Sequence, residues 1–461
     1  MGRETQTFEP RTATVGMYAC GPTVYNSAHI GNLRSYVFVD TLRRTLTSAG
    51  YSLNHVMNIT DVGHLTSDAD EGEDKMEKGA RREGKSAFEI ARHYEEEFLQ
   101  NLVDLNILMP NTICRATEHI PEQIALVQKL IDLGYTYETK DGIYFDTTKI
   151  SDYGKLANLK EQKLEAGMRV DLGEKKNPHD FAVWKFSEKP GERQMEWDAF
   201  DKKGFPGWHI ECSAMSMKYL GEQFDIHCGG IDHIPVHHTN EIAQSEAATG
   251  KQPWVNYWLH NEFLNIKSSN VSEVAKMAKS GENFITLSTL KERNIDPLAF
   301  RYLLLQTHYR KQMVFSWESL KAAVNGLNNL RKSVLKNKQA NNKPEKNEQA
   351  EIVEKFWHEI YNDLNTAGAL AIFIPAIEQN KIDYKTILEL DEALGLDLGH
   401  IRPSESSDTI ISETLKNLLD ERATARSEKN WAESDRLRDE IKNHGFIVED
   451  SAAGQKLSPV Q

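Results

Sequence analysis

The sequence predicts an α/β protein in which a parallel-sheet domain is interrupted by an insertion and followed by a helical region. Three observations support this prediction. Residues 14–59 follow a strand, loop, helix, strand pattern, and residues 118–205 have a different, loop-rich pattern. From Pro297 onward, apolar residues recur at helical spacing. A strand–helix–strand unit is right-handed, so its two strands lie parallel in one sheet.

Composition limits the class of protein. The chain has 461 residues, which is too long for one compact core and predicts two to four domains. Four widely spaced cysteines favour free thiols in a reducing compartment over a disulfide scaffold, so we expect a cytoplasmic protein. The net charge of −14 argues against nonspecific nucleic-acid binding, although a local basic patch can still bind RNA.

No segment predicts membrane association. The longest nearly apolar run, residues 367–377, contains Gly368 and Pro375 and is far shorter than the ~20 residues of a membrane span. The first twelve residues are polar and lack the apolar core of a signal peptide.

The first strand–helix–strand unit predicts an anion site. Strands are expected over residues 14–19 and 51–59, with a helix between them that ends at Gly50. The segment His29-Ile-Gly-Asn32 then lies at the amino end of this helix, where backbone N–H groups and the helix dipole favour phosphate. A capping histidine is the alternative, and it is the commoner explanation of an isolated His-x-Gly turn.

Residues 207–241 predict a metal site. His237 and Glu241 are four residues apart and share one helix face, where Cys212 could meet them. Zn²⁺ takes thiolate, imidazole and carboxylate ligands in a tetrahedron, and Cys20 is the best candidate for the fourth ligand. The alternative is that these residues are core thiols and surface histidines, and without a CxxC pair that alternative is favoured unless other observations support a site.

The rest of the chain adds a second candidate for phosphate binding. Residues 224–232 predict a buried strand, a glycine turn and an acidic residue. Lys276 and Lys279 suit a mobile loop that contacts phosphate, although a solvated surface is the alternative. Residues 336–349 have almost no apolar side chains and predict a flexible linker, and residues 410–445 predict a closing pair of helices.

These motifs together resemble a known family. His29-Ile-Gly-Asn32 and Lys276-Met-Ala-Lys279-Ser resemble the HIGH and KMSKS signatures of class I aminoacyl-tRNA synthetases. With Cys20-Gly-Pro-Thr-Val-Tyr, Gly207-Trp-His-Ile-Glu-Cys-Ser-Ala-Met and His237-His-Thr-Asn-Glu241, the chain resembles the cysteinyl-tRNA synthetases over almost its whole length.

The resemblance implies a split Rossmann-like catalytic domain and an all-α carboxyl-terminal region. The implied segments are residues 1–118 (catalytic domain, first half), 119–205 (connective insertion), 206–258 (catalytic domain, second half), 259–310 (stem-contact region with the KMSKS-like loop), 311–403 (helical bundle) and 404–461 (anticodon-binding module).

The resemblance also implies an activity and its residues. A monomer would activate L-cysteine with ATP and Mg²⁺ and transfer it to tRNA(Cys), with one zinc ion selecting the substrate thiol. The family's zinc ligands fall on Cys20, Cys212, His237 and Glu241, the set that ligand chemistry selects. Other implied roles are catalysis by His29, Asn32, Lys276 and Lys279; ATP binding by His29, Asn32, Gly230, Asp232 and Lys279; and cysteine binding by Cys20, Thr60, Trp208 and His227, which is expected to line the same cleft.

Some positions depart from the family pattern. Asn32 replaces the usual histidine and Ala278 the usual serine, and the loop over residues 267–275 is longer than usual. Because both lysine charges are kept, we expect activity to survive. The residues expected near the anticodon form a basic and aromatic cluster: Arg422, Arg426, Lys429, Trp431, Arg436 and Arg438.

Two other functions compete with this interpretation. One is a ligase that joins cysteine to an amino sugar, which would lack the full anticodon-binding end; the chain after Phe315 argues against it. The other is a noncatalytic RNA-binding paralogue, which the retained metal ligands and lysines argue against. His233 and His238 are expected to be second-sphere or surface groups, and Cys114 and Cys228 structural thiols.

Overall fold

The computed structural model describes most of the chain and divides it into two compact units. The described residues are 6–63, 74–158, 174–267, 274–276, 284–340, 343–400, 413–443, 446–451 and 454–459. The first unit is Met1–Gly399 and the second is His400–Gln461.

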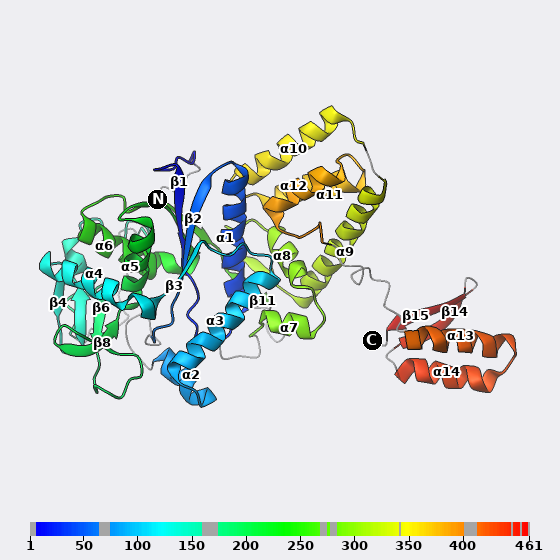
Figure 1. The fold of residues 1–461 in the computed structure, drawn as a ribbon, viewed down its shortest axis with the longest axis horizontal. Helices are drawn as coiled ribbons and strands as arrows, with labels where there is room; N and C mark the ends of the chain where they lie inside the picture. Colours follow the sequence, from blue (N-terminus) through cyan, green and yellow to red (C-terminus); the bar gives the residue numbers. More distant parts are fainter. Residues whose placement is uncertain are drawn as a thin grey trace. The chain divides into compact units, whose positions relative to one another are not determined.

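A five-stranded parallel sheet forms the centre of the first unit, in the order β10-β9-β1-β2-β3 (Figure 1). Strands β9 and β10 come after the inserted segment, yet they extend the sheet that the first three strands begin. The predicted α/β fold with a split parallel sheet is therefore confirmed. The strands are β1 (Thr14–Ala19), β2 (Ser52–Ile59), β3 (Thr112–Arg115), β9 (Phe224–Gly230) and β10 (Val255–Asn261).

The helices of this domain include one that the sequence analysis did not expect. Residues 75–83 form α2, within a strongly charged stretch of the sequence. Asp74 caps this helix by accepting hydrogen bonds from Met76 N and Glu77 N, and Gly84 ends it with a positive φ of 65°. The other helices are α1 (Ile30–Ser48), α3 (Ala87–Asp104), α5 (Trp208–Leu220) and α6 (Thr239–Thr249).

The insertion forms its own antiparallel sheet, in the order β4-β5-β6-β8-β7. Its buried side chains Phe145 and Trp184 belong to the same hydrophobic cluster as Tyr18, Phe224 and Trp254 of the parallel-sheet domain. This shared core fixes the insertion against the parallel sheet. Its elements are α4 (Ile120–Asp132), β4 (Thr136–Glu138), β5 (Gly142–Phe145), β6 (Phe181–Phe186), β7 (Trp197–Ala199) and β8 (Lys202–Pro206).

A small sheet and a helical bundle complete the first unit. The sheet has the order β12-β11-β13, with β11 (Leu264–Lys267), β12 (Val274–Lys276) and β13 (Met313–Phe315). The helices are α7 (Leu287–Glu292), α8 (Pro297–Leu305), α9 (Trp317–Ala340), α10 (Lys346–Tyr361), α11 (Thr366–Glu378) and α12 (Tyr384–Leu394).

The prediction of a flexible linker over residues 336–349 is wrong for its described part. Helix α9 continues to Ala340, and α10 begins at Lys346. Polar composition misled the prediction, because these residues use their polar groups within the fold. Asn337 is buried and donates through Nδ2 to Ile382 O at 2.8 Å, and Gln349 Oε1 accepts from Asp383 N at 2.9 Å.

The second unit contains the predicted pair of helices, α13 (Glu413–Ser427) and α14 (Trp431–Asn443). It also contains an antiparallel hairpin, β14 (Phe446–Ser451) and β15 (Gly454–Pro459), which the all-α expectation for this region omitted. Leu418, Leu437 and Val448 are buried together, so helices and hairpin share one small core. Among the described residues, no helix is both long and apolar enough to cross a membrane.

Candidate functional site

A cleft of about 350 Å³ opens at the carboxyl ends of strands β1, β2 and β9. Ligands of open parallel sheets bind at this edge, outside the carboxyl ends of the strands. Nine of the residues singled out from the sequence line the cleft: Cys20, His29, Asn32, Thr60, Trp208, Cys212, Gly230, Asp232 and His237.

Cys20 is held at the cleft by a close approach between two backbone segments. It follows β1 directly, and its N–H donates to Cys228 O at 3.2 Å. The next residue, Gly21, donates from its N–H to Asn58 Oδ1 at 2.8 Å. A Cβ on Gly21 would overlap the carbonyl oxygen of Asn58, so only glycine allows the chain to turn here.

Helix geometry brings the other three candidate ligands to Cys20. Cys212 lies in α5, while His237 is the penultimate residue of a π-helical turn over Ile234–His238 that leads into α6. His237 Nε2 lies 2.9 Å from Glu241 Oε1, as expected for residues four apart. The ligand atoms of Cys20, Cys212, His237 and Glu241 all lie within 4.8 Å of one another.

The donor set fits a zinc ion. Glu241 Oε2 is 2.9 Å from His227 Nε2. Glu241 Oε1 is buried and lies 2.9 Å from His237 Nε2, but this contact is not a hydrogen bond, and Oε1 has no hydrogen-bond partner among the described residues. The other ring nitrogen of His237, Nδ1, is 3.0 Å from His209 Nδ1. One donor atom of each side chain therefore faces the common point while the other is anchored, which is typical of metal ligands. Two thiols, an imidazole and a carboxylate are zinc donors.

The electrostatics of the site favour a divalent cation. A hydrogen bond from the Cys20 thiol lowers the pKa of Cys212 to about 7, against the opposing effect of burial. Burial by itself would raise the pKa of Glu241, but the charges of His227 and His237 lower it to about 2. Burial raises the pKa of Cys20 well above its usual value. A carboxylate and a readily formed thiolate therefore lie buried together. Although burial opposes it, they raise the pKa of His237 to about 10, and a bound cation would take the place of that proton.

A second group of possible ligands overlaps the first. Cys20, His227, His238 and Glu241 also lie within 4.8 Å, but they share two residues with the predicted set and contain only one sulfur. Since soft thiolate ligands select zinc, the set with two cysteines is the better match.

Several histidines lie elsewhere than the sequence analysis expected. His227 is fully buried behind Glu241 and is absent from the cleft lining, so the expectation that it lines the cleft is corrected. His238 is also fully buried, 3.5 Å from Cys20 Sγ and 2.7 Å from His260 Nε2, which excludes a surface position. The sequence analysis missed His209 and His260, because neither belongs to a ligand-spacing pattern.

His29 and Asn32 form a capping box at the start of α1. Asn32 N donates to His29 Nδ1 at 3.1 Å, and His29 N donates to Asn32 Oδ1 at 3.3 Å. Because Nδ1 accepts, the proton of the neutral imidazole resides on Nε2, which is a donor. Both side chains line the cleft at a positive helix end, an arrangement suited to anions.

The segment that carries the two lysines begins and ends near His29. Leu264, at the start of β11, lines the cleft, and β12 returns antiparallel with Lys276 opposite Asn265. On the far side, Ile30 N donates to Ile285 O at 2.9 Å, and Thr286 pairs with His29 in an isolated bridge. The side chain of Lys276, and Lys279 entirely, lie outside the described residues.

The basic cluster of the second unit is mostly engaged within the protein. Arg422 is buried and makes two 3.0 Å contacts with the carboxylate of Asp450. Arg436 is paired with Glu433 and Glu440, and Arg438 with Asp435. Trp431 is different: it is 57% exposed, with the guanidinium of Arg426 5.6 Å from its ring.

Comparisons with known proteins cover nearly the whole chain. Residues 7–325 match the family described as tRNA synthetases class I (C) catalytic domain, and residues 409–456 match the Cysteinyl-tRNA ligase anticodon binding domain. The chain is 51% identical over 460 residues to Cysteine--tRNA ligase 1 of Burkholderia lata, covering 99% of this chain and 95% of that protein. It is 45% identical over 484 residues to Cysteine--tRNA ligase of Treponema denticola, covering 98% and 97%.

A solved structure shows the same fold at low sequence identity. Methionyl-tRNA synthetase of Mycobacterium tuberculosis, bound by methionyl-adenylate, superposes with a TM-score of 0.59 and 14% identity. The match covers 84% of this chain and 88% of that one.

Proposed function

This chain belongs to the cysteine–tRNA ligase family of class I aminoacyl-tRNA synthetases, an enzyme family that joins cysteine to tRNA, and from that premise we propose how its residues do so. The substrates are L-cysteine, ATP with Mg²⁺, and tRNA(Cys). The four free cysteines support action in the reducing cytoplasm, and we propose that the enzyme acts there as a monomer.

Zinc is the proposed resident metal, held by Cys20, Cys212, His237 and Glu241. The convergence of these four donors, three of which line the cleft while Glu241 is buried behind them, is the observation that carries the proposal. A bound zinc ion supplies a soft Lewis acid that favours a substrate thiolate over a serine hydroxyl. A site that depends on one specific polar contact can discriminate by about 10⁴-fold or more, so the reaction needs no editing step.

The walls around this site would hold the small side chain of cysteine. Trp208 lines the cleft and stacks on His237 with ring centroids 4.2 Å apart, which leaves little room beside the candidate ligands. Thr60, which directly follows β2, also lines the cleft, and its hydroxyl accepts from Asn58 Nδ2 at 3.1 Å. His227 contributes indirectly, by orienting the carboxylate of Glu241.

Cysteine activation requires the substrate carboxylate to attack the α-phosphorus of ATP as pyrophosphate leaves. His29 donates from Nε2 toward the phosphates, and the start of α1 adds backbone dipoles. Asn32 assists as a neutral donor. Gly230, the last residue of β9, and Asp232, in the turn that follows, both line the cleft and are proposed to contact the ATP ribose and base.

Lys276 and Lys279 are proposed to neutralise charge on the β- and γ-phosphates as the transition state forms. Support comes from both ends of their segment, since β11 and Ile285 lie beside the amino end of α1. Charge supplied by a closing loop raises kcat, because it acts mainly in the transition state.

Transfer to tRNA is proposed to use the second unit to hold the anticodon. Exposed Trp431, with Arg426 beside it, supplies a surface on which an unpaired base can stack. Arg422 stabilises the unit itself, because it is buried against Asp450.

Cysteine-dependent ATP–pyrophosphate exchange, followed by charging of tRNA(Cys), tests the proposal. We expect both reactions, with strong preference for cysteine over serine and one zinc per chain by elemental analysis. Exchange without charging would indicate the amino-sugar ligase instead, and no exchange would indicate a noncatalytic paralogue.

A further inference from the structure

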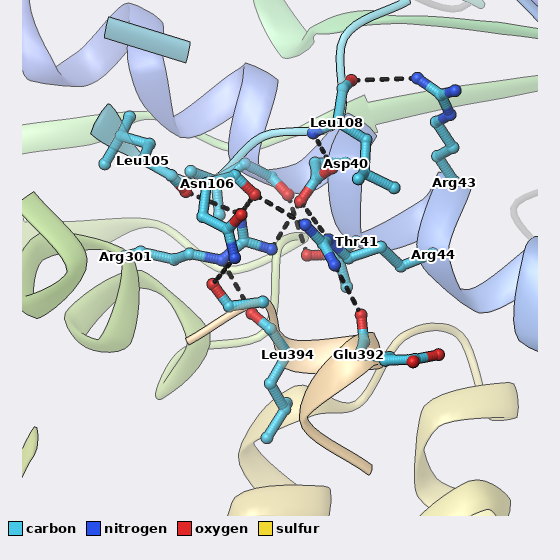
Figure 2. Close-up of polar contacts among 12 residues, drawn as sticks. Asp40, Thr41, Arg43, Arg44, Leu105, Asn106, Leu108, Arg301, Glu392 and Leu394 are labelled. Atoms are coloured by element: carbon cyan, nitrogen blue, oxygen red, sulfur yellow. Dashed lines mark hydrogen bonds and ion pairs between the residues drawn. The ribbon is translucent and has the colours of Figure 1, made fainter. Parts of the chain in front are cut away.

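A buried ionic network lies away from the cleft, around Asp40 in the third turn of α1 (Figure 2). The Asp40 side chain is completely buried. Its Oδ2 accepts from Arg44 Nε at 2.7 Å and from Arg301 Nη2 at 2.6 Å, while its Oδ1 accepts from Leu108 N at 2.9 Å. Although burial opposes ionisation, the two arginines lower the pKa of Asp40, so the carboxylate is charged.

The two arginines also satisfy the ends of two helices. Arg301 donates through Nε to Leu394 O at 2.8 Å and through Nη1 to Leu105 O at 2.9 Å. Arg44 donates to Glu392 O at 2.9 Å and to Asn106 O at 2.7 Å. These carbonyls close α12 and α3, whose carboxyl ends carry partial negative charge and unpaired acceptors. The excess positive charge of two arginines over one carboxylate is thereby offset.

Gly395 makes room for this arrangement. It ends α12 with a φ of +63°, and a Cβ at this position would collide with the Arg301 guanidinium. Its carbonyl oxygen accepts from Asn106 Nδ2 at 3.0 Å, which ties α12 to the end of α3. The guanidinium of Arg301, itself fully buried, therefore has a single well-defined position among four helices.

The same helix α1 is attached to both ends of the lysine segment. Near its start, Ile30 N donates to Ile285 O. One turn later, buried Arg34 donates to Phe263 O at 2.5 Å, just before β11, and to Lys311 O at 2.6 Å, just before β13. Asp40 adds the third attachment, to Arg301 of α8, the helix that follows Ile285 and α7.

We propose that Asp40 and Arg301 are positioning residues for cysteine activation: they fix α8 against α1 and so fix Ile285, where the chain returns from the segment that carries the two lysines, relative to His29. Neither residue touches substrate. The inference rests on the proposed function, because it presumes that His29 and the two lysines act on the same ATP. Misplacement of a catalytic group by about 1 Å can cost about 100-fold in rate, so a small shift of α8 is enough to matter.

The test compares Asp40→Asn and Arg301→Lys with the unmodified full-length enzyme. The arginine variant keeps a positive charge for Asp40 but loses the fork that reaches the carbonyl groups of Leu394, Leu105 and, at 3.1 Å, Asn106, so it carries the test if Asp40→Asn does not fold. Exchange kinetics are measured well below the unfolding temperature, together with zinc content. We expect kcat to fall by about 10- to 100-fold, while the KM for cysteine changes by less than about twofold and zinc stays stoichiometric.

Lys185→Met in the inserted sheet is the matched control. Lys185 is a buried cation that donates to Asp141 Oδ2 at 2.6 Å and to Tyr144 OH at 2.9 Å. Both partners belong to the insertion, which includes neither α1 nor α8. We expect this variant to unfold at lower temperature with an unchanged kcat.

Three results would overturn the inference. The network variants could be less stable and yet keep the wild-type kcat, or they could lose zinc and show a raised KM for cysteine. The third result is a fall of kcat in the control that equals the fall in the network variants. Absence of exchange in the unmodified enzyme would instead overturn the proposed function.

Discussion

Replacing His55 by leucine should make the enzyme more resistant to acid. His55 lies in β2 and is 2% exposed, and neither ring nitrogen has a hydrogen-bond partner among the described residues. Burial, aided by the charge of Arg43, lowers its pKa to about 3. The folded protein therefore keeps this ring neutral at a pH where the unfolded chain binds a proton.

The sign and size of the effect follow from the two pKa values. The pKa of an unfolded histidine is about 6.5. The contribution of His55 to the free energy of unfolding is therefore fully present above pH 6.5 and is lost as the pH falls from 6.5 toward 3. Between pH 7.5 and pH 5 the loss from this one group is about 2 kcal/mol. Leucine has a similar volume and does not titrate, so it removes this pH-dependent part.

Urea unfolding at a series of pH values measures this difference. The change in midpoint between wild type and His55→Leu, multiplied by the common slope, gives the free-energy difference, in which all other titrating groups cancel. We expect the difference to be constant above pH 7 and to move by about 2 kcal/mol in favour of the variant at pH 5. His358→Gln, at an exposed position of α10, is the matched control for loss of a histidine outside the core. Parallel curves for His55→Leu and wild type would refute the reasoning.

Three further predictions concern function. Cys212→Ser should weaken zinc affinity by at least about tenfold and reduce discrimination against serine; full zinc content with unchanged preference would contradict the proposed metal site. Asn32→His should leave exchange nearly unchanged, because imidazole and amide are both donors, and a large loss of kcat would show that the amide has a specific role. Trp431→Ala should weaken tRNA binding by about 1–3 kcal/mol, seen as a raised KM for tRNA in charging, with exchange unaffected. A fall in exchange would place this residue's effect elsewhere.

Local chemistry explains what could be predicted from the sequence. The spacing of His237 and Glu241 places both on one helix turn whatever the surrounding fold, and donor softness then selects cysteines as partners. The strand–helix–strand pattern likewise placed His29 at a helix start beside a strand end. These inferences depend on short-range geometry, which periodicity encodes directly.

Features that depend on distant partners could not be predicted. Asp40 and Arg301 are 261 positions apart, and each alone resembles an ordinary charged residue of an amphipathic helix. For His238 the sequence left a second-sphere and a surface position open, because its burial is created by β9 and β10 around it. Polar residues near Asn337 suggested a linker, since their partners, such as Ile382, lie in the distant loop between α11 and α12. Tertiary contacts decided each case.

The separation of the candidate zinc ligands along the chain has a consequence for biosynthesis. Cys20 is translated before the inserted sheet, and Glu241 is made only after that entire sheet. Until then the emerging amino-terminal strand carries a thiol without its three companions. With the proposed ligand set, metal capture follows translation of the inserted sheet, and the first half of the catalytic domain folds initially without metal.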